Sequence, residues 1–346
     1  MAQIPDPVLL RKALNSWDPT QEILRSENLS PGVSKNCVYK LWLKSGQTLI
    51  AKISNFGNYQ RFMEDHDLVQ QWARLLKTSR FKNLLADPVG LENHVFSFEG
   101  EERWVVFYEE VHRGASLPRA LTEAQIRSFA REIAALHRES LRIEKDLPAP
   151  SYSVRTDIID LRDNLHTLDL TPNERAGLRN HCDRFLDALT TFSYETRARI
   201  PLLMDWNIGN FSITGTGESF SLESRWDYDW FRVEPRVFDF YFCSRVVSHV
   251  GDKTVFSYNA TTFNEPRFGI FLRAYHEAFP LDPKEIDFLK EVYRFFILNY
   301  IFREGESFFT PEIYRHLRQE AFDIYLAQVD EIKPLVSLQE KGEEKT

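Results

Sequence analysis

The chain has 346 residues, of which 43% are hydrophobic and 27% charged, which excludes a disordered polypeptide and predicts a globular protein with two lobes or domains. Its 51 acidic residues outnumber the 43 basic ones, and the net charge of −8 disfavours a nucleic-acid-binding protein. No signal peptide or membrane span is expected, and three widely spaced cysteines (Cys37, Cys182 and Cys243) suit reduced thiols. We therefore expect a cytoplasmic protein without membrane or nucleic-acid partners, and the sequence does not indicate its oligomeric state.

The first hundred residues read as rich in β-structure. Two strand-like runs at 37–43 and 48–53 are separated by a turn that contains Gly46, which predicts a hairpin. A helix is expected at 62–77, where apolar residues recur at helical spacing, and strands at 95–98 and 104–108.

After Gly114 the pattern becomes helical. Thr122 is predicted to cap a helix whose apolar positions continue to His137 at i, i+3, i+4 spacing. Further helices are expected at 155–167, 172–190 and roughly 268–332, and a compact region of strands and turns at 201–229.

These patterns predict an α+β protein with a small β-rich lobe at 1–110 and a larger, mainly helical lobe at 111–338. The connector lies near 109–116, and the cleft between two such lobes is a common place for a ligand. The charged tail at 339–346 is expected to be disordered.

The strongest chemical signal is Asp-Trp-Asn-Ile-Gly-Asn at 205–210. The carboxylate of Asp205 can orient or deprotonate a hydroxyl group, and the side-chain oxygen of Asn210 can bind a hard cation. Asp227 follows a predicted strand and can hold Mg²⁺ against phosphates. Each piece alone is also typical of an ordinary turn, because Asp, Asn and Gly favour turns.

This order of residues resembles the Asp-x-x-x-x-Asn loop and the following Asp-Trp-Glu-like segment of the aminoglycoside phosphotransferase and choline kinase-like family. The resemblance implies a two-lobed protein-kinase-like fold, with Asp205 as catalytic base and Asn210 and Asp227 as Mg²⁺ ligands. It also implies that Asp229 lies near a second metal ion or the substrate, with Trp230 beside it.

Two further segments are similar to this family. The segment at 234–239 matches a stretch whose acid after a proline has a structural role, here Asp239. The helix that ends near His137 resembles the family's Leu-His helix, and we interpret this histidine as structural. The family usually has His-Gly before the catalytic acid, whereas this chain has Leu203 and Met204, which puts the geometry of the loop in question.

The predicted small lobe contains a lysine that suits a kinase. Lys52 lies in a strand-like segment and can pair with the α- and β-phosphates of ATP, although a solvated strand lysine has the same pattern. A kinase lysine usually has a carboxylate partner on the next helix. Glu64 is preferred for this role over Asp65 and Asp67, and all three also suit a solvated helix start.

Two backbone segments are expected to contact the nucleotide. The turn that contains Ser34 can cover phosphates with its N–H groups, although it holds a single glycine. The segment from Glu109 to Val111 resembles the family's adenine-binding connector, which would bind the base through backbone groups.

The leading hypothesis is a kinase that uses ATP and Mg²⁺ to phosphorylate a small hydroxyl-bearing substrate. The alternatives are a pseudokinase or nucleotide-binding regulatory module without phosphotransfer, and a helical scaffold with chance motifs. An aminoglycoside, choline, an amino alcohol and a sugar all stay open as substrates. A cation is a candidate because acidic and aromatic residues could surround it, although an acidic surface over an aromatic core explains the same residues: Asp229, Trp230, Glu234, Tyr241, Glu304 and Glu306.

Overall fold

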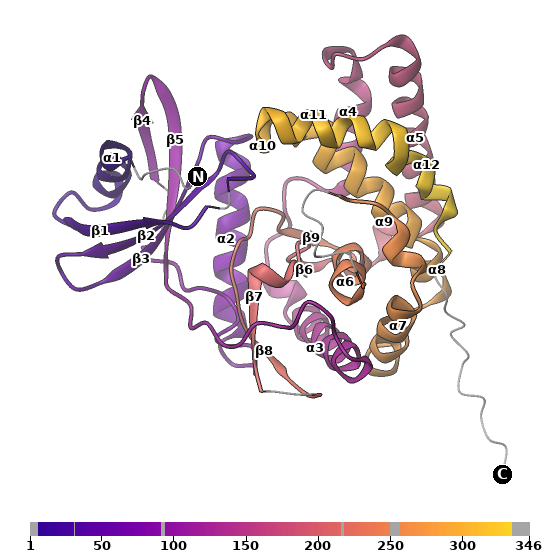
Figure 1. The fold of residues 1–346 in the computed structure, drawn as a ribbon, viewed down its shortest axis with the longest axis horizontal. Helices are drawn as coiled ribbons and strands as arrows, with labels where there is room; N and C mark the ends of the chain where they lie inside the picture. The colour runs from indigo at the N-terminus through magenta and orange to yellow at the C-terminus, as the bar shows by residue number, and fades with distance from the viewer. Residues whose placement is uncertain (1–5, 31, 91–93, 216–217, 250–256, 334–346) are drawn as a thin grey trace.

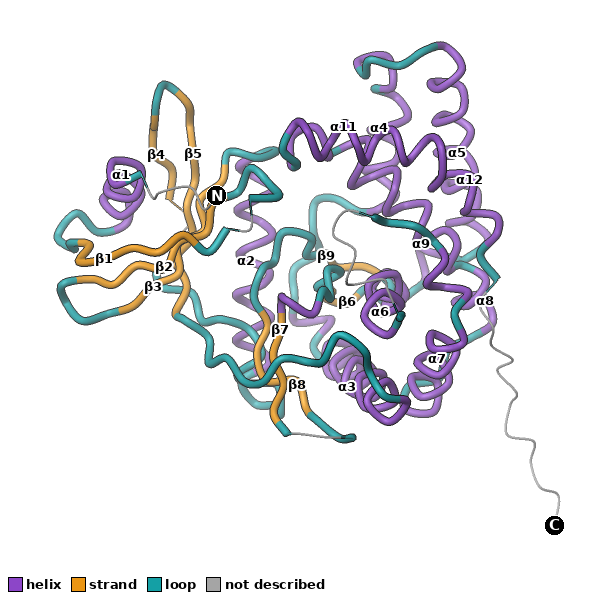
Figure 2. Tube along the Cα trace, in the orientation of Figure 1, coloured by secondary structure: helices purple, strands orange, loops and turns teal. Residues whose placement is uncertain are grey.

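The computed structural model describes residues 6–30, 32–90, 94–215, 218–249 and 257–333. The tail predicted to be disordered, 339–346, lies outside the described residues. Most strands gather in the N-terminal part and most helices lie beyond it, as Figure 2 shows. Among the described residues, none of the helices combines the length and the apolar character needed to cross a membrane.

The N-terminal lobe is built on a five-stranded antiparallel sheet with the order β1-β2-β3-β5-β4 (Figure 1). Its strands are β1 (Ile23–Asn28), β2 (Cys37–Leu43), β3 (Thr48–Ser54), β4 (His94–Phe98) and β5 (Glu101–Glu109). The predicted hairpin is confirmed as β2 and β3, with Leu41 opposite Leu49. Strand β1 and helix α1 (Pro7–Trp17) were not predicted.

The two faces of this sheet belong to two separate cores. Val105 and Phe107 on β5 pack with α1 in a small core. Their neighbours Val106 and Tyr108 point to the other face and join a large core that continues through α2 (Tyr59–Leu76) into the helical lobe. The strand period of two therefore assigns alternate residues to opposite sides of the sheet.

The helical lobe begins at α3 (Glu123–Arg142), which Thr122 caps as predicted, in a capping box with Gln125. The helix predicted at 172–190 is confirmed; the one predicted at 155–167 ends at Asp163 and is followed by a 3-10 helix at Leu165–Thr167; the one predicted at 268–332 is a series of shorter helices. The remaining elements are α4 (Val154–Asp163), α5 (Pro172–Thr191), β6 (Ile200–Leu202), β7 (Phe211–Thr214), β8 (Ser221–Arg225), β9 (Arg232–Glu234), α6 (Phe240–Val247), α7 (Pro266–Ala278), α8 (Pro283–Asp287), α9 (Leu289–Phe296), the π-helical Ile297–Arg303, α10 (Gly305–Phe308), α11 (Pro311–Glu320), the π-helical Ala321–Tyr325 and α12 (Leu326–Gln328).

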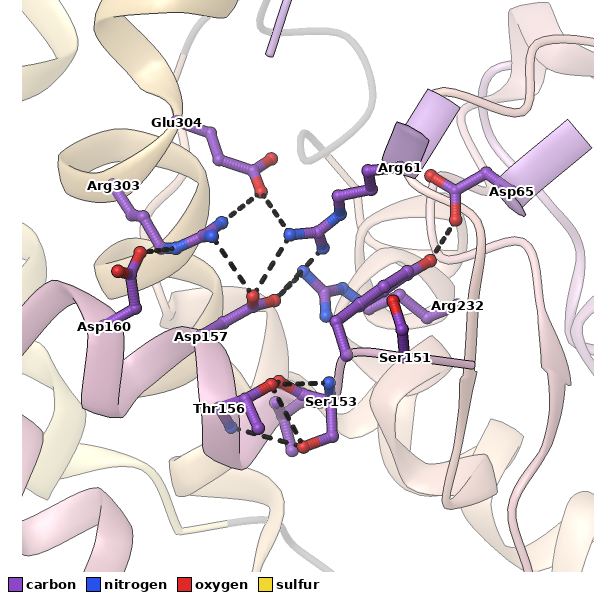
Figure 3. A network of polar contacts seen from close by, with 12 residues as sticks. Arg61, Asp65, Ser151, Ser153, Thr156, Asp157, Asp160, Arg232, Arg303 and Glu304 are labelled. Atoms are coloured by element: carbon purple, nitrogen blue, oxygen red, sulfur yellow. Dashed lines mark hydrogen bonds and ion pairs between the residues drawn. The ribbon is translucent and has the colours of Figure 1, made fainter. Parts of the chain in front are cut away.

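A polar network ties α2 to the helical lobe (Figure 3). Arg61 on α2 donates two hydrogen bonds, each 3.1 Å long, to the carboxylate of Asp157 on α4. Arg232 and Arg303 reach the same carboxylate at 2.7 and 3.3 Å. Burial alone would raise the pKa of Asp157, but the three guanidinium groups outweigh burial and lower it to about 2. One buried carboxylate thus binds arginines from both lobes.

Candidate active site

Several cavities lie between the lobes, and two of them adjoin at the loop that carries Asn210. The first, which we call the sheet cavity, has a volume of about 340 Å³, and the second, the loop cavity, about 270 Å³. Asn210, Asp227 and Gly209 line both. The sheet cavity is also lined by Lys52, Tyr108, Glu109, Glu110 and Val111, and the loop cavity by Ser34, Asn36, Asp205, Asp229, Trp230 and Arg245. Side chains that are distant in the sequence therefore converge on one crevice.

Asp205 and Asn210 lie on the loop that joins β6 to β7. The side-chain nitrogen of Asn210 donates to Oδ2 of Asp205 at 3.0 Å, and the N–H of Asn207 donates to Oδ1 at 3.2 Å. Arg225, which is buried, donates to the backbone carbonyl oxygens of Asp205 at 2.7 Å and Asn210 at 3.2 Å. These bonds fix the acid and the amide side by side, as their spacing in the sequence predicted.

Asp239 anchors the same loop from the start of α6. Its carboxylate accepts hydrogen bonds from the N–H of Met204 and from Nε1 of Trp206, both at 2.8 Å. His137 contacts the same carboxylate through Nε2 at 2.9 Å, and its Nδ1 lies 2.8 Å from the hydroxyl of Tyr275. Both Asp239 and His137 are buried, so they position the loop without lining either cavity.

Lys52 points into the crevice because of its register on β3. It lies opposite Val106, on the sheet face turned away from α1. Its ammonium group forms ion pairs with Asp229 and, at 3.5 Å, with Asp227. Burial lowers the pKa of Lys52, but the two carboxylates outweigh burial and raise it, so the lysine is charged.

The prediction that Glu64 pairs with Lys52 is wrong. Glu64 instead accepts hydrogen bonds from the N–H and the hydroxyl of Ser151, and its neighbour Asp65 binds the hydroxyl of Tyr152. His66 is one of the residues of α2 that face the sheet, and it is buried against the hydroxyl of Tyr108. Since each helical residue turns about 100°, a side chain two positions from His66 points to the far side of the helix.

Two side chains that sequence reasoning missed hold Asp229 in place. The amide nitrogen of Asn36 donates to Oδ1 of Asp229 at 3.0 Å, and the hydroxyl of Ser54 donates to Oδ1 of Asn36 at 2.6 Å. Both Asn36 and Ser54 are buried. Asp229 is therefore the carboxylate that pairs with Lys52, the role that was predicted for Glu64 on α2. Asn36 and Ser54 are polar residues at the two ends of the hairpin, and this pair is the one signal in the sequence that could have pointed to the contact with Asp229.

The loop between β1 and β2 is bound to the helical lobe. The N–H of Lys35 donates to the carbonyl of Phe308 at 2.8 Å, and the N–H of Thr310 donates to the carbonyl of Val33 at 3.2 Å. Ser34 lies between these bonds, opposite Phe309, and lines the loop cavity. We call this pair of backbone bonds the loop tie. Its partners are far apart in the chain, so no local pattern predicts it.

The connector after β5 lies along the sheet cavity. The N–H of Glu109 donates to the carbonyl of Asp87 at 2.8 Å, so this N–H is not available to a ligand in the cavity. Further on, Gly114 lies against Ile213 on β7, where a Cβ atom would come within 2.4 Å of the Ile213 carbonyl oxygen. Only glycine allows the connector to run this close to β7, the strand that follows Asn210.

Four residues that were candidates for a cation site do not line the loop cavity. Glu234 is buried and accepts hydrogen bonds from the N–H of Val154 at 2.7 Å and from Tyr194 at 2.7 Å. Tyr241 packs in the large core, and Glu304 belongs to the Asp157 network. Glu306 is exposed, which leaves Asp229 and Trp230 from the predicted set.

The oxygen donors at the junction of the two cavities suit a hard cation. Because the amide nitrogen of Asn210 donates to Asp205, its carbonyl oxygen is the atom that can ligate a metal. Asp227 lines the same space and supplies a carboxylate. One amide oxygen and one carboxylate fit Mg²⁺, which takes few protein ligands and completes its shell with phosphates and water.

No family model matches the chain, and no curated protein matches it. Solved structures do share its fold at low identity. A microcompartment-associated aminopropanol kinase is 16% identical with a TM-score of 0.60, covering 94% of this chain and 97% of its own. An amicoumacin kinase, solved with AMP-PNP, Ca²⁺ and Ami, is 15% identical with a TM-score of 0.58, covering 91% and 90%. A choline kinase from Streptococcus pneumoniae is 15% identical with a TM-score of 0.53, covering 89% and 94%. The α+β fold predicted from the sequence is thus confirmed: the chain has the two-lobed, kinase-like fold of these structures.

Proposed function

We propose that the protein is an ATP-dependent kinase that transfers the γ-phosphoryl group to a hydroxyl of a small molecule. The observation that carries this proposal is the convergence of Lys52, Asp205, Asn210 and Asp227 on two joined cavities between the lobes. The fold supports it, since the similar structures are named as kinases of small molecules.

The sheet cavity is the place for the nucleotide. Its walls combine apolar side chains of the sheet with the connector, where the carbonyl of Glu109 and the N–H of Val111 can bind the edge of a base. Lys52 can then contact the α- and β-phosphates, and the backbone around Ser34 can cover them. A protein catalyses phosphoryl transfer mainly by such positioning and by neutralising charge.

Asn210 and Asp227 would hold Mg²⁺, which neutralises the charge of the phosphate oxygens when bound. Asp205 can accept the proton of the attacking hydroxyl, because its carboxylate lines the loop cavity and is oriented by Asn207 and Asn210. Asp229 acts through Lys52 as a positioning residue, in the place where a helix carboxylate was expected.

The test is Mg²⁺-dependent ADP formation with a panel of alcohols, for the wild type and for Asp205→Ala. Loss of a general base lowers turnover by about 10²–10⁴-fold, while ATP with Mg²⁺ should still raise the melting temperature of the variant. Unchanged turnover in Asp205→Ala would remove Asp205 from the mechanism. A melting shift without turnover on any alcohol favours the nucleotide-binding module, and the absence of both contradicts the proposal.

A further inference from the structure

The turn that carries Asp227 is joined to the loop that carries Asn210. The N–H of Trp226 donates to the carbonyl of Asn210 at 3.0 Å, so a backbone hydrogen bond connects the two candidate metal ligands. Asp227 itself has a left-handed backbone, with φ 69°, in a region that L-residues rarely adopt. Its carboxylate makes long contacts, 3.4 Å to the N–H of Asp229 and 3.5 Å to Lys52. The residues on either side of Asp227 must therefore fix its position.

Tyr228, the residue after Asp227, binds two backbone groups through one hydroxyl. The hydroxyl donates to the carbonyl of Arg225 at 2.8 Å and accepts from the N–H of Ala86 at 2.9 Å. Tyr228 is 5% exposed, and its ring meets the ring of Tyr108 edge-on at a centroid distance of 5.7 Å. A buried hydroxyl with both a donor and an acceptor partner has a fixed orientation. Both neighbours of Asp227 are thus anchored.

The segment that binds this hydroxyl, residues 84–87, also reaches the connector. The carbonyl of Leu84 accepts from the N–H of Arg225 at 2.6 Å. At the other end of the segment, the carbonyl of Asp87 accepts from the N–H of Glu109 at 2.8 Å. Four consecutive residues therefore hold the turn with the candidate metal ligand on one side and the connector on the other. We call residues 84–87 the linking segment.

We propose that the hydroxyl of Tyr228 is a positioning group for metal binding, which holds the carboxylate of Asp227 where a divalent cation meets the phosphates of the nucleotide. This inference rests on the proposed kinase function and adds a residue to it. The ring of Tyr228 belongs to the large core, whereas its hydroxyl joins the turn to Ala86 in the linking segment. Groups that orient a metal ligand from outside the coordination shell typically change metal affinity by about tenfold to a hundredfold.

Tyr228→Phe removes the hydroxyl and keeps the ring, so it tests the positioning role directly. The affinity for AMP-PNP is measured by calorimetry with EDTA and again with saturating Mn²⁺, and the ratio of the two dissociation constants gives the contribution of the metal. We expect Tyr228→Phe to lower this ratio by about tenfold and to leave the dissociation constant in EDTA within about twofold of the wild type, because the metal ligand moves while the cavity walls stay.

Tyr293→Phe is the matched control. Tyr293 lies on α9, is buried, and donates to the carbonyl of Tyr258 at 2.8 Å, the same length as the bond from Tyr228 to Arg225. Both variants lose a buried tyrosine hydroxyl, so a general loss of stability should lower both melting temperatures. The contribution of the metal should change in Tyr228→Phe and stay unchanged in Tyr293→Phe.

A measurement on the wild type tests the same link without a substitution. Adding Mg²⁺ to the AMP-PNP complex should slow amide hydrogen exchange in a peptide that covers the linking segment by about threefold or more, because fixing Asp227 also fixes the hydroxyl that binds the N–H of Ala86. Peptides from α5 serve as the reference.

Three results would each overturn the inference: an unchanged metal contribution in Tyr228→Phe, an equal loss of affinity with and without Mn²⁺, or exchange in the linking segment that does not respond to Mg²⁺. Failure of the proposed function is a different result. In that case the wild type binds no nucleotide, or binds it without any response to Mn²⁺.

Discussion

Met204, the residue before Asp205, has a left-handed backbone. Its φ is 55°, in a region that costs an L-residue about 1–2 kcal/mol. The family that this sequence resembles has glycine at this position, where the conformation has no such cost. Here the N–H of Met204 is bound by Asp239, and its side chain is 2% exposed. Burial of a side chain of this size contributes about 1.5–3 kcal/mol, which offsets the strain.

Two substitutions separate the strain from the burial. Met204→Ala empties the buried site and keeps the strain, so it should cost about 2–5 kcal/mol in free energy of unfolding. Met204→Gly empties the same site and removes the strain. We therefore expect the glycine variant to be more stable than the alanine variant by about 1 kcal/mol, the reverse of their usual order in a helix. Urea denaturation of both variants measures the difference, and an alanine variant of equal or higher stability would show that the loop relaxes.

At the residue scale, the sequence predicted the placement of those residues whose position depends on local spacing or on the alternation of a strand. Asp205 and Asn210 share one loop, and the alternation of β3 places Lys52 on the cleft side. The role assigned to Glu64 was wrong because helix phase could not be read from the sequence and because the partner of Lys52, Asp229, comes from the helical lobe. Asn36 and Asp229 meet only after the two lobes have packed, so their contact has no signature in the sequence.

At the scale of elements, the loop tie can be tested by removing one of its two backbone hydrogen bonds, the one from Thr310 to Val33. Thr310 has φ −62°, which proline adopts, and its side chain makes no capping bond. Phe309 before it is extended, with φ −80° and ψ 159°, as a residue before proline prefers. Thr310→Pro therefore removes the N–H that binds Val33 without forcing the local backbone to change.

We expect Thr310→Pro to speed amide hydrogen exchange at residues 33–36 by about fivefold, since one backbone hydrogen bond contributes about 1 kcal/mol. Thr310→Ala keeps the N–H and should leave the exchange unchanged. Mass-spectrometric exchange on peptides that cover this loop makes the measurement, with peptides from α3 as an internal reference. Equal exchange in the two variants would mean that side-chain contacts such as the packing of Val33 against the large core hold the loop instead.

Elements with strong periodicity and clear caps were predicted, as α3 and the hairpin show. Those that lack these signals were missed. Strand β1 lies at the edge of the sheet, and each of its residues is half-buried or exposed, so it has no buried apolar run to mark it in the sequence. Every residue of α6 is buried, so this helix has no solvent-exposed polar face to mark it in the sequence. Tertiary packing specifies such segments.

At the scale of the whole molecule, the lobes are held together by one continuous core and by the Asp157 network. Helix α2 contributes Trp72 and Leu68 to the large core, and Arg61 to the network. Asp157 is 3% exposed, whereas Asp160, one turn later on α4, is 53% exposed and pairs with the same Arg303. The two acids thus form a matched pair that differs in burial.

Replacing Asp157 by Asn leaves three guanidinium groups without their shared carboxylate. Removing one partner of a buried ion pair costs about 3–5 kcal/mol, so Asp157→Asn should destabilise the protein by that amount. Asp160→Asn breaks an exposed pair and should cost less than about 1 kcal/mol. Urea denaturation followed by circular dichroism gives both values, and equal losses would contradict a central role for Asp157.

The pH dependence of the stability difference between the wild type and Asp157→Asn gives an independent check on the role of this carboxylate. The pKa of Asp157 is lowered to about 2 in the folded protein from an ordinary value of 3.8, so the folded state binds fewer protons between these values than the unfolded chain. Its contribution is therefore complete above about pH 4 and is lost as the pH falls towards 2. The stability difference between the wild type and Asp157→Asn should stay constant from pH 5 to pH 8 and shrink below about pH 4. A difference that declined already between pH 7 and pH 5 would mean that the three arginines do not hold this carboxylate in its charged form.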